Sequence, residues 1–568
     1  MTISAITIEN FKGIGAPVRI ELKPITLLFG ANSAGKSTVL QALLYAREIL
    51  ARRNTDPDRT ELGGEHVDLG GFRNLIHNHD QDLRIALGFE LDLSGVDLVD
   101  YADIPQMRVR PTSAAAAAMT SDESVKPAYD PMAMAQFLDE LSAHTATASI
   151  LLTVNWSEIK DEPVQADYEV GINGEAAARI RTDPATSSQH VLEFNAHHPL
   201  FWTPDEPREE MSQTNSDAGN VNALSTPVWH SVSVLEVDLY RSTGRTPETL
   251  IDEIADTLAR FNLDEFRDAL PYFDALPFIV MAPAEYLLSQ LNALRYLGPI
   301  REVPSRTYHP TLSPDVSRWA NGLAAWDWVQ LASQEQLAGL NAWLTREDRI
   351  NTGYRMEVKR FKELNTDSML MLGLMDNAEM LDNYPAIKEQ LDALPLKTRV
   401  VLRQEADFLE VSPQDVGIGI SQVIPVIVSA LDAGDRLTVI EQPELHIHPA
   451  IQVALGDLFI QSARADGGSR GPHFLIETHS EHLLLRLLRR IRETSAGSVR
   501  SEWALSPESL AVYLVEATST GTEIRALQVD DEGNFTERWP RGFFEEREEE
   551  IFGPNTDLEE EVNRTVGK

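Results

Sequence analysis

The sequence predicts an α/β fold with a mixed β-sheet, and three observations support this prediction. Residues 24–29 (PITLLF) form a near-continuous apolar run, which is typical of a strand buried on both faces. Residues 36–53 follow a glycine-rich turn and carry apolar side chains at helical spacing. Residues 437–440 (LTVI) and 473–477 (HFLIE) are two more short apolar runs, each followed by a polar turn and a helical segment. Strands that alternate with helices indicate a sheet covered by helices.

The remaining segments add strands and irregular stretches to this core. Residues 3–8 and 18–22 alternate in polarity and predict a hairpin. Between about 85 and 200, several alternating segments predict an antiparallel β-lobe. A Pro/Ser/Ala-rich stretch at 112–135 and a polar stretch at 205–228 predict a mobile excursion and a linker.

Composition excludes several classes of protein. There are 49 Lys and Arg residues against 88 Asp and Glu, which gives a formal net charge of −39. Such a charge repels phosphate backbones, so the composition does not indicate nucleic acid as a partner. A local basic groove would still make nucleic acid a possible partner. The chain has no cysteine, which excludes disulfides and thiolate metal sites. The start is not a signal peptide and no apolar run approaches ~20 residues, so we expect a cytoplasmic protein without a membrane segment.

The turn after the first buried run carries the most specific motif. Residues 30–37 (GANSAGKS) match the P-loop pattern G-x-x-x-x-G-K-[ST] between a strand and a helix. In such a loop the backbone amides surround phosphate oxygens at the positive end of the helix. Lys36 would reach the β- and γ-phosphates and Ser37 would bind Mg²⁺, so ATP and Mg²⁺ are the expected cofactors. The expected nucleotide-binding residues are Gly30, Ala31, Asn32, Ser33, Ala34, Gly35, Lys36, Ser37 and Thr38.

Three later motifs add acidic, histidine and glycine-rich elements. Glu441 ends the strand LTVI far downstream of the P-loop and is the expected second Mg²⁺ ligand, so a large insertion must be looped out of one sheet. His479 follows the strand HFLIE, where a histidine can contact the γ-phosphate. Ser421 lies in DVGIGISQ, where glycines and a helix N-terminus make an anion-binding end. We expect this last motif to face the P-loop of a second subunit.

The set GANSAGKST, DVGIGISQ, IEQPELHIHP and ETHSEHLL resembles the ABC-type ATPase heads of chromosome-maintenance and double-strand-break-repair proteins. It is most similar to prokaryotic AAA ATPases related to the overcoming-lysogenization-defect family, many of them anti-phage components. The start IENFKGIG, the stretch YLGPIR at 296–301 and the ending WPRGFF at 539–544 resemble a subgroup with a short C-terminal domain of unknown role. The resemblance covers roughly residues 1–90 and 290–545.

This resemblance implies roles for single residues. It makes 30–38 the Walker A loop, Glu441 the Walker B carboxylate, Ser421 the signature serine acting in trans and His479 the switch histidine. Gln442 stands where ABC-type heads carry the catalytic glutamate, and an amide cannot act as a general base. Either Glu444 substitutes for it or hydrolysis is slow. Arg301 and Arg306 are candidates for phosphate contacts or for ordinary ion pairs.

The function implied is that of an ATPase switch that forms a homodimer or higher homo-oligomer through its heads. A role in anti-phage defence with a separately encoded effector follows from the resemblance. The alternatives are a DNA-repair or chromosome-associated ATPase that binds duplex DNA directly, and a non-hydrolysing scaffold assembled by ATP. A Toprim nuclease is not expected, because Glu516 and Asp530 are too close in sequence for that fold. His77 and His79 are expected to be ordinary loop histidines.

Five parts are therefore expected along the chain. The first part of the ATPase head spans 1–95, and an inserted β-rich lobe with mobile loops spans 96–228. A helical or mixed insertion spans 229–395, with helical spacing from 247 to about 295. The second part of the head spans 396–515. A short C-terminal domain occupies 516–568, with an acidic tail over 545–561.

Overall fold

The structure of the protein is a computed structural model, which divides into two compact units. It describes residues 3–52, 55, 61–62, 65–66, 71–94, 145–182, 190–195, 198, 229–235, 270–306, 308, 310–311, 316–367, 371, 384–464 and 471–537. The expected loops at 112–135 and 205–228, the helical stretch 247–269, the motif at 539–544 and the acidic tail lie outside these residues. The first unit contains Met1–Lys23, Phe29–Leu294 and Tyr513–Ala526, and the second contains Pro24–Leu28, Arg295–Val512 and Leu527–Lys568.

The first unit contains an eight-stranded sheet with the order β11-β10-β9-β8-β7-β6-β1-β2. Each pair of neighbours in this order is antiparallel. Buried and partly exposed positions alternate along β1 and β6, as expected for a sheet with one covered face. The strands are β1 (Ile3–Glu9), β2 (Val18–Glu21), β6 (Ile85–Asp92), β7 (Thr147–Ser157), β8 (Glu162–Ile172), β9 (Glu175–Thr182), β10 (His190–Asn195) and β11 (Trp229–Leu235).

Two long helices belong to the same unit. Helix α1 (Lys36–Arg52) begins within the P-loop motif and contacts α6 (Leu270–Ala293), which also contacts β7, β8 and β9. Hairpin strands β18 (Leu510–Thr518) and β19 (Gly521–Leu527) are neighbours in a second sheet, and most of this hairpin lies in the first unit. The short elements are β4 (Glu61–Leu62), β5 (Glu65–His66), α2 (Phe72–Leu75) and η2 (His77–His79).

The second unit contains the strands that carry the acidic and histidine motifs. Strand β16 (Leu437–Glu441) lies between β12 (Arg295–Leu297) and β17 (His473–Thr478), and it is parallel to both. The sheet continues to β3 (Ile25–Gly30) and β18. All six residues of β3 are buried, which explains why its sequence reads as a continuous apolar run.

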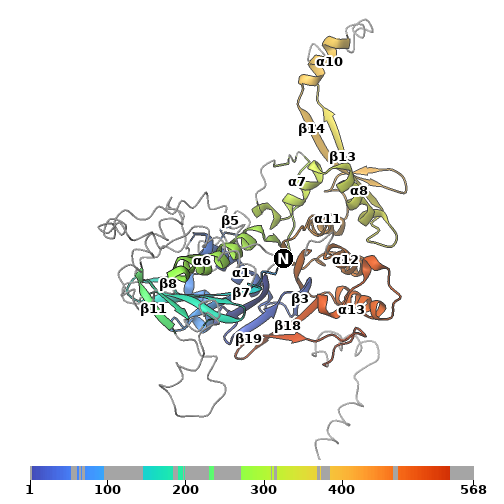
Figure 1. Cartoon of the computed structure of the whole chain (residues 1–568). Helices are drawn as coiled ribbons and strands as arrows, with labels where there is room; N and C mark the ends of the chain where they lie inside the picture. The colour runs from blue at the N-terminus through green and yellow to red at the C-terminus, as the bar shows by residue number, and fades with distance from the viewer. Residues whose placement is uncertain are drawn as a thin grey trace, which may run out of the picture. The chain divides into compact units, whose positions relative to one another are not determined.

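The same unit contains several helices and a β-ribbon that forms a separate three-stranded sheet. Strands β13 (Tyr354–Lys362) and β14 (Leu396–Gln404) pair over nine positions, and β15 (Glu410–Val411) joins the edge of β14 (Figure 1). The helices are α7 (Leu323–Leu331), α8 (Gln334–Thr345), α10 (Tyr384–Ala393), α11 (Ile418–Leu431), α12 (Pro449–Ser462) and α13 (Glu481–Ser495), with short turns η8 (Val316–Trp319), η10 (Ser501–Trp503) and η11 (Pro507–Ser509).

The predicted α/β class is confirmed, and so are the strands and helices expected around each motif. The antiparallel β-lobe is confirmed for its described strands. The strand β13 was not anticipated, because its sequence YRMEVKRFK has only weak apolar alternation. Within the part of the chain described, no helix is long and apolar enough to cross a bilayer.

Candidate functional site

The expected site residues fall in both units: the P-loop lies in the first, and Ser421, Glu441 and His479 lie in the second. The P-loop belongs to the first unit, where β3 ends at Gly30 and α1 begins at Lys36. Lys36 is only 4% exposed, and its Nζ donates to the carbonyls of Gly30 at 3.1 Å and Ala31 at 2.9 Å. These bonds curl the loop around the ammonium group, while Ala31, Asn32 and Ser33 stay exposed.

Glycine is required at both ends of this loop. Gly35 has a φ of +103°, and a Cβ there would lie 2.7 Å from Thr522 Oγ1. A Cβ on Gly30 would lie 2.2 Å from the carbonyl oxygen of Val515. The loop therefore fits a phosphate cradle, since side chains at these positions would displace the backbone that forms it.

The β18–β19 hairpin supports the P-loop from the same unit, which the sequence did not reveal. Thr522 Oγ1 donates to the Ala34 carbonyl at 3.1 Å, and the Thr522 amide donates to the Gly13 carbonyl at 2.6 Å. A lone threonine nearly five hundred positions from the loop carries no sequence signal that would predict such a contact.

In the second unit, Glu441 ends β16 and is held by a neighbouring strand. Tyr296 of β12 donates its phenol to Glu441 Oε1 at 3.2 Å. Burial raises the pKa of Tyr296 above its ordinary value, and the negative charge of Glu441 adds to the effect. The phenol therefore stays protonated and remains a donor to the carboxylate.

The turn after Glu441 is held by a buried arginine. Gln442 has a φ of +43°, which is uncommon for a residue other than glycine. Its backbone N–H donates to the Glu477 carbonyl at 2.8 Å. Arg301 is 2% exposed, and its Nη2 donates to the carbonyls of Glu441 at 2.8 Å and Gln442 at 3.1 Å. Burial lowers the pKa of Arg301 to about 10, so it is still a cation at neutral pH.

Arg301 is also joined to the helix that follows the glycine-rich motif. Gln422 of α11 donates from Nε2 to the Arg301 carbonyl at 2.6 Å and accepts from the Arg301 amide at 3.3 Å. Arg306 pairs instead with Asp415 at 2.6 Å. Both arginines that were candidates for phosphate contacts thus have protein partners.

Glu444 and His479 are in direct contact. Glu444 Oε1 accepts from the His479 amide at 2.6 Å, and Oε2 accepts from Thr478 Oγ1 at 2.8 Å. Burial raises the pKa of the Glu444 carboxyl, and the hydrogen bonds that it accepts oppose this rise. The sequence motifs placed Glu444 and His479 near the same reaction, but they did not predict this bond.

Ser421 lies in the first turns of α11 and is 1% exposed. Its hydroxyl donates to the Pro413 carbonyl at 2.7 Å. The preceding residues Gly417 and Ile418 are exposed, with Ile418 at 59%. The motif therefore presents Gly417 and Ile418 to solvent, while the buried Ser421 hydroxyl bonds to the backbone of the preceding loop.

Two family models of ATPase domains match the chain. Residues 1–166 match a family described as "AAA ATPase domain". Residues 312–486 match one described as "AAA domain, putative AbiEii toxin, Type IV TA system". A third model, described as a protein of unknown function, matches residues 505–552. The first two matches include the P-loop, Glu441 and His479, so they support an ATP-binding ATPase.

Three solved structures are similar to the chain; each match covers 93% of it and has a TM-score of 0.34. They are an SmcHead bound to the C-winged helix domain of ScpA (10% identity, 98% of that chain), an Smc head domain with an extended coiled coil bound to the C-terminal domain of ScpA from Pyrococcus furiosus (10%, 97%), and an SMC head domain from Thermotoga maritima (8%, 100%). No curated protein matches the chain.

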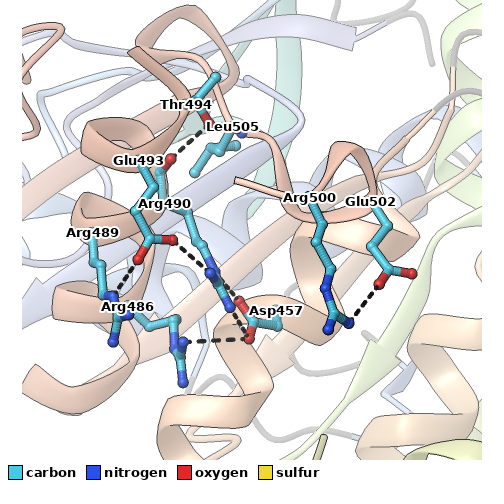
Figure 2. A network of polar contacts seen from close by, with 9 residues as sticks. All are labelled: Asp457, Arg486, Arg489, Arg490, Glu493, Thr494, Arg500, Glu502 and Leu505. Atoms are coloured by element: carbon cyan, nitrogen blue, oxygen red, sulfur yellow. Dashed lines mark hydrogen bonds and ion pairs between the residues drawn. The ribbon is translucent and has the colours of Figure 1, made fainter. Parts of the chain in front are cut away.

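Helices α12 and α13, which follow the loops after β16 and β17, are joined by an ion-pair network (Figure 2). Asp457 of α12 accepts two bonds from Arg490 of α13, at 2.7 and 2.8 Å. Arg490 also donates to Glu493 at 2.6 Å, and its guanidinium lies 4.5 Å from the centre of the Trp503 ring. Since Asp457 and Arg490 are both buried, this pair fixes α12 against α13.

The remaining polar candidates in the ATPase have structural roles. His77 Nδ1 contacts the Lys12 carbonyl at 2.9 Å, and His79 Nδ1 contacts the Arg73 carbonyl at 2.7 Å. Glu516 lies in β18, within the β18–β19 hairpin. Among the residues that the structure describes, no group of three or more His, Asp or Glu side chains is arranged to hold a metal ion.

Proposed function

We propose that this protein is an ATP-dependent switch that binds Mg²⁺–ATP, hydrolyses it slowly and closes as a homodimer or higher homo-oligomer around the nucleotide. The observation that carries the proposal is the P-loop, in which the Lys36 ammonium lies inside a turn that only glycine permits at residues 30 and 35. The matches to AAA ATPase models at both motif groups support it.

In this proposal residues 30–38 bind the triphosphate, with Lys36 on the β- and γ-phosphates. Ser37 and Glu441 hold Mg²⁺, which would neutralise the phosphate charge. Tyr296 orients the Glu441 carboxylate through the bond at 3.2 Å. His479 senses the γ-phosphate and couples its loss to movement of the rest of the chain.

Slow turnover follows from Gln442. Its side chain is an amide, which can orient a water but cannot accept a proton from it. The backbone of Gln442 has a φ of +43°, and its carbonyl accepts a bond from Arg301 Nη2, so the turn that carries this amide is held in place. ATP binding would therefore last long enough to act as a signal.

The exposed backbone at Gly417 and Ile418 is the surface that we propose meets the nucleotide of a second copy. Ser421, the expected signature residue, would act by fixing this loop, since its hydroxyl is bonded to the Pro413 carbonyl. Helix N-termini favour anions, which supports a phosphate as the ligand.

Nucleotide binding by wild type and Lys36→Ala tests the proposal. Each charge-assisted hydrogen bond lost is worth roughly 1.5–3 kcal/mol, so ATP affinity should fall at least tenfold. Lys388→Ala removes an exposed lysine of α10 and serves as the matched control. Equal ATP affinity in wild type and Lys36→Ala would refute the site.

The biological role that we propose is anti-phage defence with a separately encoded effector. The resemblance to ATPases related to the overcoming-lysogenization-defect family supports this role. The description of the family that matches residues 312–486 also names a toxin of a Type IV TA system. Deletion of the protein from its host should raise the titre of at least one phage in a broad panel. Unchanged titres across the panel would count against this role.

One observation favours a second function, direct binding of duplex DNA. Arg355 and Lys359 of β13 pair with Arg403 and Arg399 of β14, which places four cations on one face of the ribbon. A two-stranded ribbon can enter the major groove. Glu357 and Glu410 partly neutralise this face, and the net charge of −39 opposes binding. Stimulation of ATP hydrolysis by DNA would favour this function, and measurable ATP binding without any turnover would favour the scaffold alternative.

A further inference from the structure

We propose that Glu444 is a positioning residue that latches the loop of His479 to the turn of Glu441 and Gln442, and that it is not the general base. This inference rests on the proposed ATPase function. It concerns contacts that lie entirely in the second unit.

The first argument is the occupancy of the carboxylate. One oxygen accepts the His479 amide and the other accepts the Thr478 hydroxyl, at 2.6 and 2.8 Å. A general base must reach the attacking water at about 2.6–3.2 Å. Each oxygen has a second acceptor site, but a proton transferred to either oxygen would weaken the bond that this oxygen already accepts. The group affected would be a backbone amide or a hydroxyl next to the switch histidine.

The second argument is that other bonds join the same two loops. The Gln442 amide donates to the Glu477 carbonyl at 2.8 Å, which ties the turn after β16 to the end of β17. Ser480 Oγ donates to Gln452 at 2.7 Å, and Gln452 donates to the Ile447 carbonyl at 2.8 Å. Glu444 lies between Gln442 and Ile447 in the sequence, and its carboxylate adds two more bonds between the loops. We call this set of bonds between the loop after β16 and the loop after β17 the seam.

The seam explains how a change at the γ-phosphate would reach the turn. The His479 side chain is carried by a backbone whose amide is bonded to Glu444. A shift of His479 must therefore pull on Glu444, and Glu444 is only three residues from Glu441. A latch of this kind makes the acidic turn and the switch histidine move together.

Asp457 provides a matched control for the latch. It is a buried carboxylate that joins the two loop–helix segments, because Asp457 of α12 pairs with Arg490 of α13, away from the loops (Figure 2). Loss of Asp457 should lower stability without selectively slowing the chemical step. Loss of Glu444 should slow the chemical step.

The experiment compares Glu444→Gln, Glu444→Ala and Asp457→Asn in the full chain. Glutamine has one acceptor for the His479 amide and can donate to Thr478 Oγ1, so it should keep kcat within about threefold of wild type. Glu444→Ala should lower kcat at least tenfold with little change in KM for ATP. Asp457→Asn should lower Tm and leave kcat near wild type well below its Tm. A general base would make Glu444→Gln lose roughly 10²–10⁴-fold in kcat, and its acid pH limb would vanish.

Hydrogen exchange at the His479 amide tests the latch without turnover. In the nucleotide-free protein this amide should exchange at least tenfold faster in Glu444→Ala than in wild type, and Glu444→Gln should keep most of the protection. Unchanged exchange in Glu444→Ala, or a collapse of kcat in Glu444→Gln, would overturn the inference. Absence of ATP binding by wild type would instead remove the proposed function and leave the exchange result valid.

Discussion

The P-loop and the acidic turn are built by different means, although both are short turns at the end of a buried strand. The P-loop is shaped by its own backbone, through glycines at residues 30 and 35 and through the bonds of Lys36 to two carbonyls within the motif. The acidic turn has a strained Gln442 in place of glycine. It is held by the side chains of Arg301 and Tyr296 from distant segments, and by the bond between its own Glu444 and the His479 amide.

This difference predicts how each turn responds to substitution. A turn made by its own backbone fails when the backbone geometry is forbidden, and the damage stays local. A turn held by buried charge fails when one partner is removed, because the polar atoms left behind have no water to replace it. Substitutions in the P-loop should therefore reduce nucleotide binding with little loss of stability. Removal of a side chain that holds the acidic turn should reduce stability.

The largest expected effect is that of Gly35→Val on ATP binding. A β-branched residue disfavours the φ of +103°, and its Cβ would meet Thr522 Oγ1 at 2.7 Å. ATP affinity should fall at least tenfold in equilibrium binding, while the apparent Tm changes little. Gly339→Ala is the control, since a Cβ at this site in α8 meets nothing within 4 Å. A large fall in Tm for Gly35→Val would break the comparison, because the loop would then support the whole unit.

The fold could be predicted where the signal is local. The hydrophobic run of β3 and the helical spacing of α1 fix a strand–turn–helix unit within some thirty residues, and the alternating segments fix the antiparallel strands. The ribbon strand β13 was missed because its charged residues hide the apolar face that contains Met356. Its partner β14 lies beyond a long intervening segment, so pairing could not be read from neighbouring residues.

The candidate site divides in the same way. Lys36, Glu441 and His479 could be predicted as site residues because the sequence around each matches a specific motif. The contacts that support them were not found, because Arg301 and Tyr296 reach Glu441 across 140 and 145 positions and Thr522 reaches Ala34 across 488. Such contacts depend on which strands become neighbours, and a single sequence does not state this.

The next effect in size is that of Arg301→Met on stability. Methionine has a similar length but leaves the carbonyls of Glu441 and Gln442 without their shared donor, which should cost about 2–4 kcal/mol. The apparent Tm should fall by roughly 5–15 °C, and kcat should fall more than ATP affinity does. Differential scanning calorimetry and steady-state kinetics measure the two. Arg306→Met is the control, since its pair with Asp415 is exposed and worth little. An unchanged Tm would show that side chains do not hold the acidic turn.

The smallest effect should come from Tyr296→Phe, which removes a single hydroxyl and keeps the ring. The bond to Glu441 Oε1 is 3.2 Å long, so its loss should cost no more than about 1 kcal/mol. If Tyr296 orients the carboxylate for a metal ion, the Mg²⁺ concentration needed for half-maximal turnover should rise about two- to fivefold while kcat at saturating Mg²⁺ stays close to wild type. Tyr308→Phe removes a phenol that donates to Asp327 instead, so it should leave the Mg²⁺ dependence unchanged. The same Mg²⁺ dependence in wild type and Tyr296→Phe would show that Glu441 is oriented without the phenol, and it would leave Arg301 and Glu444 as the side chains that define the acidic turn.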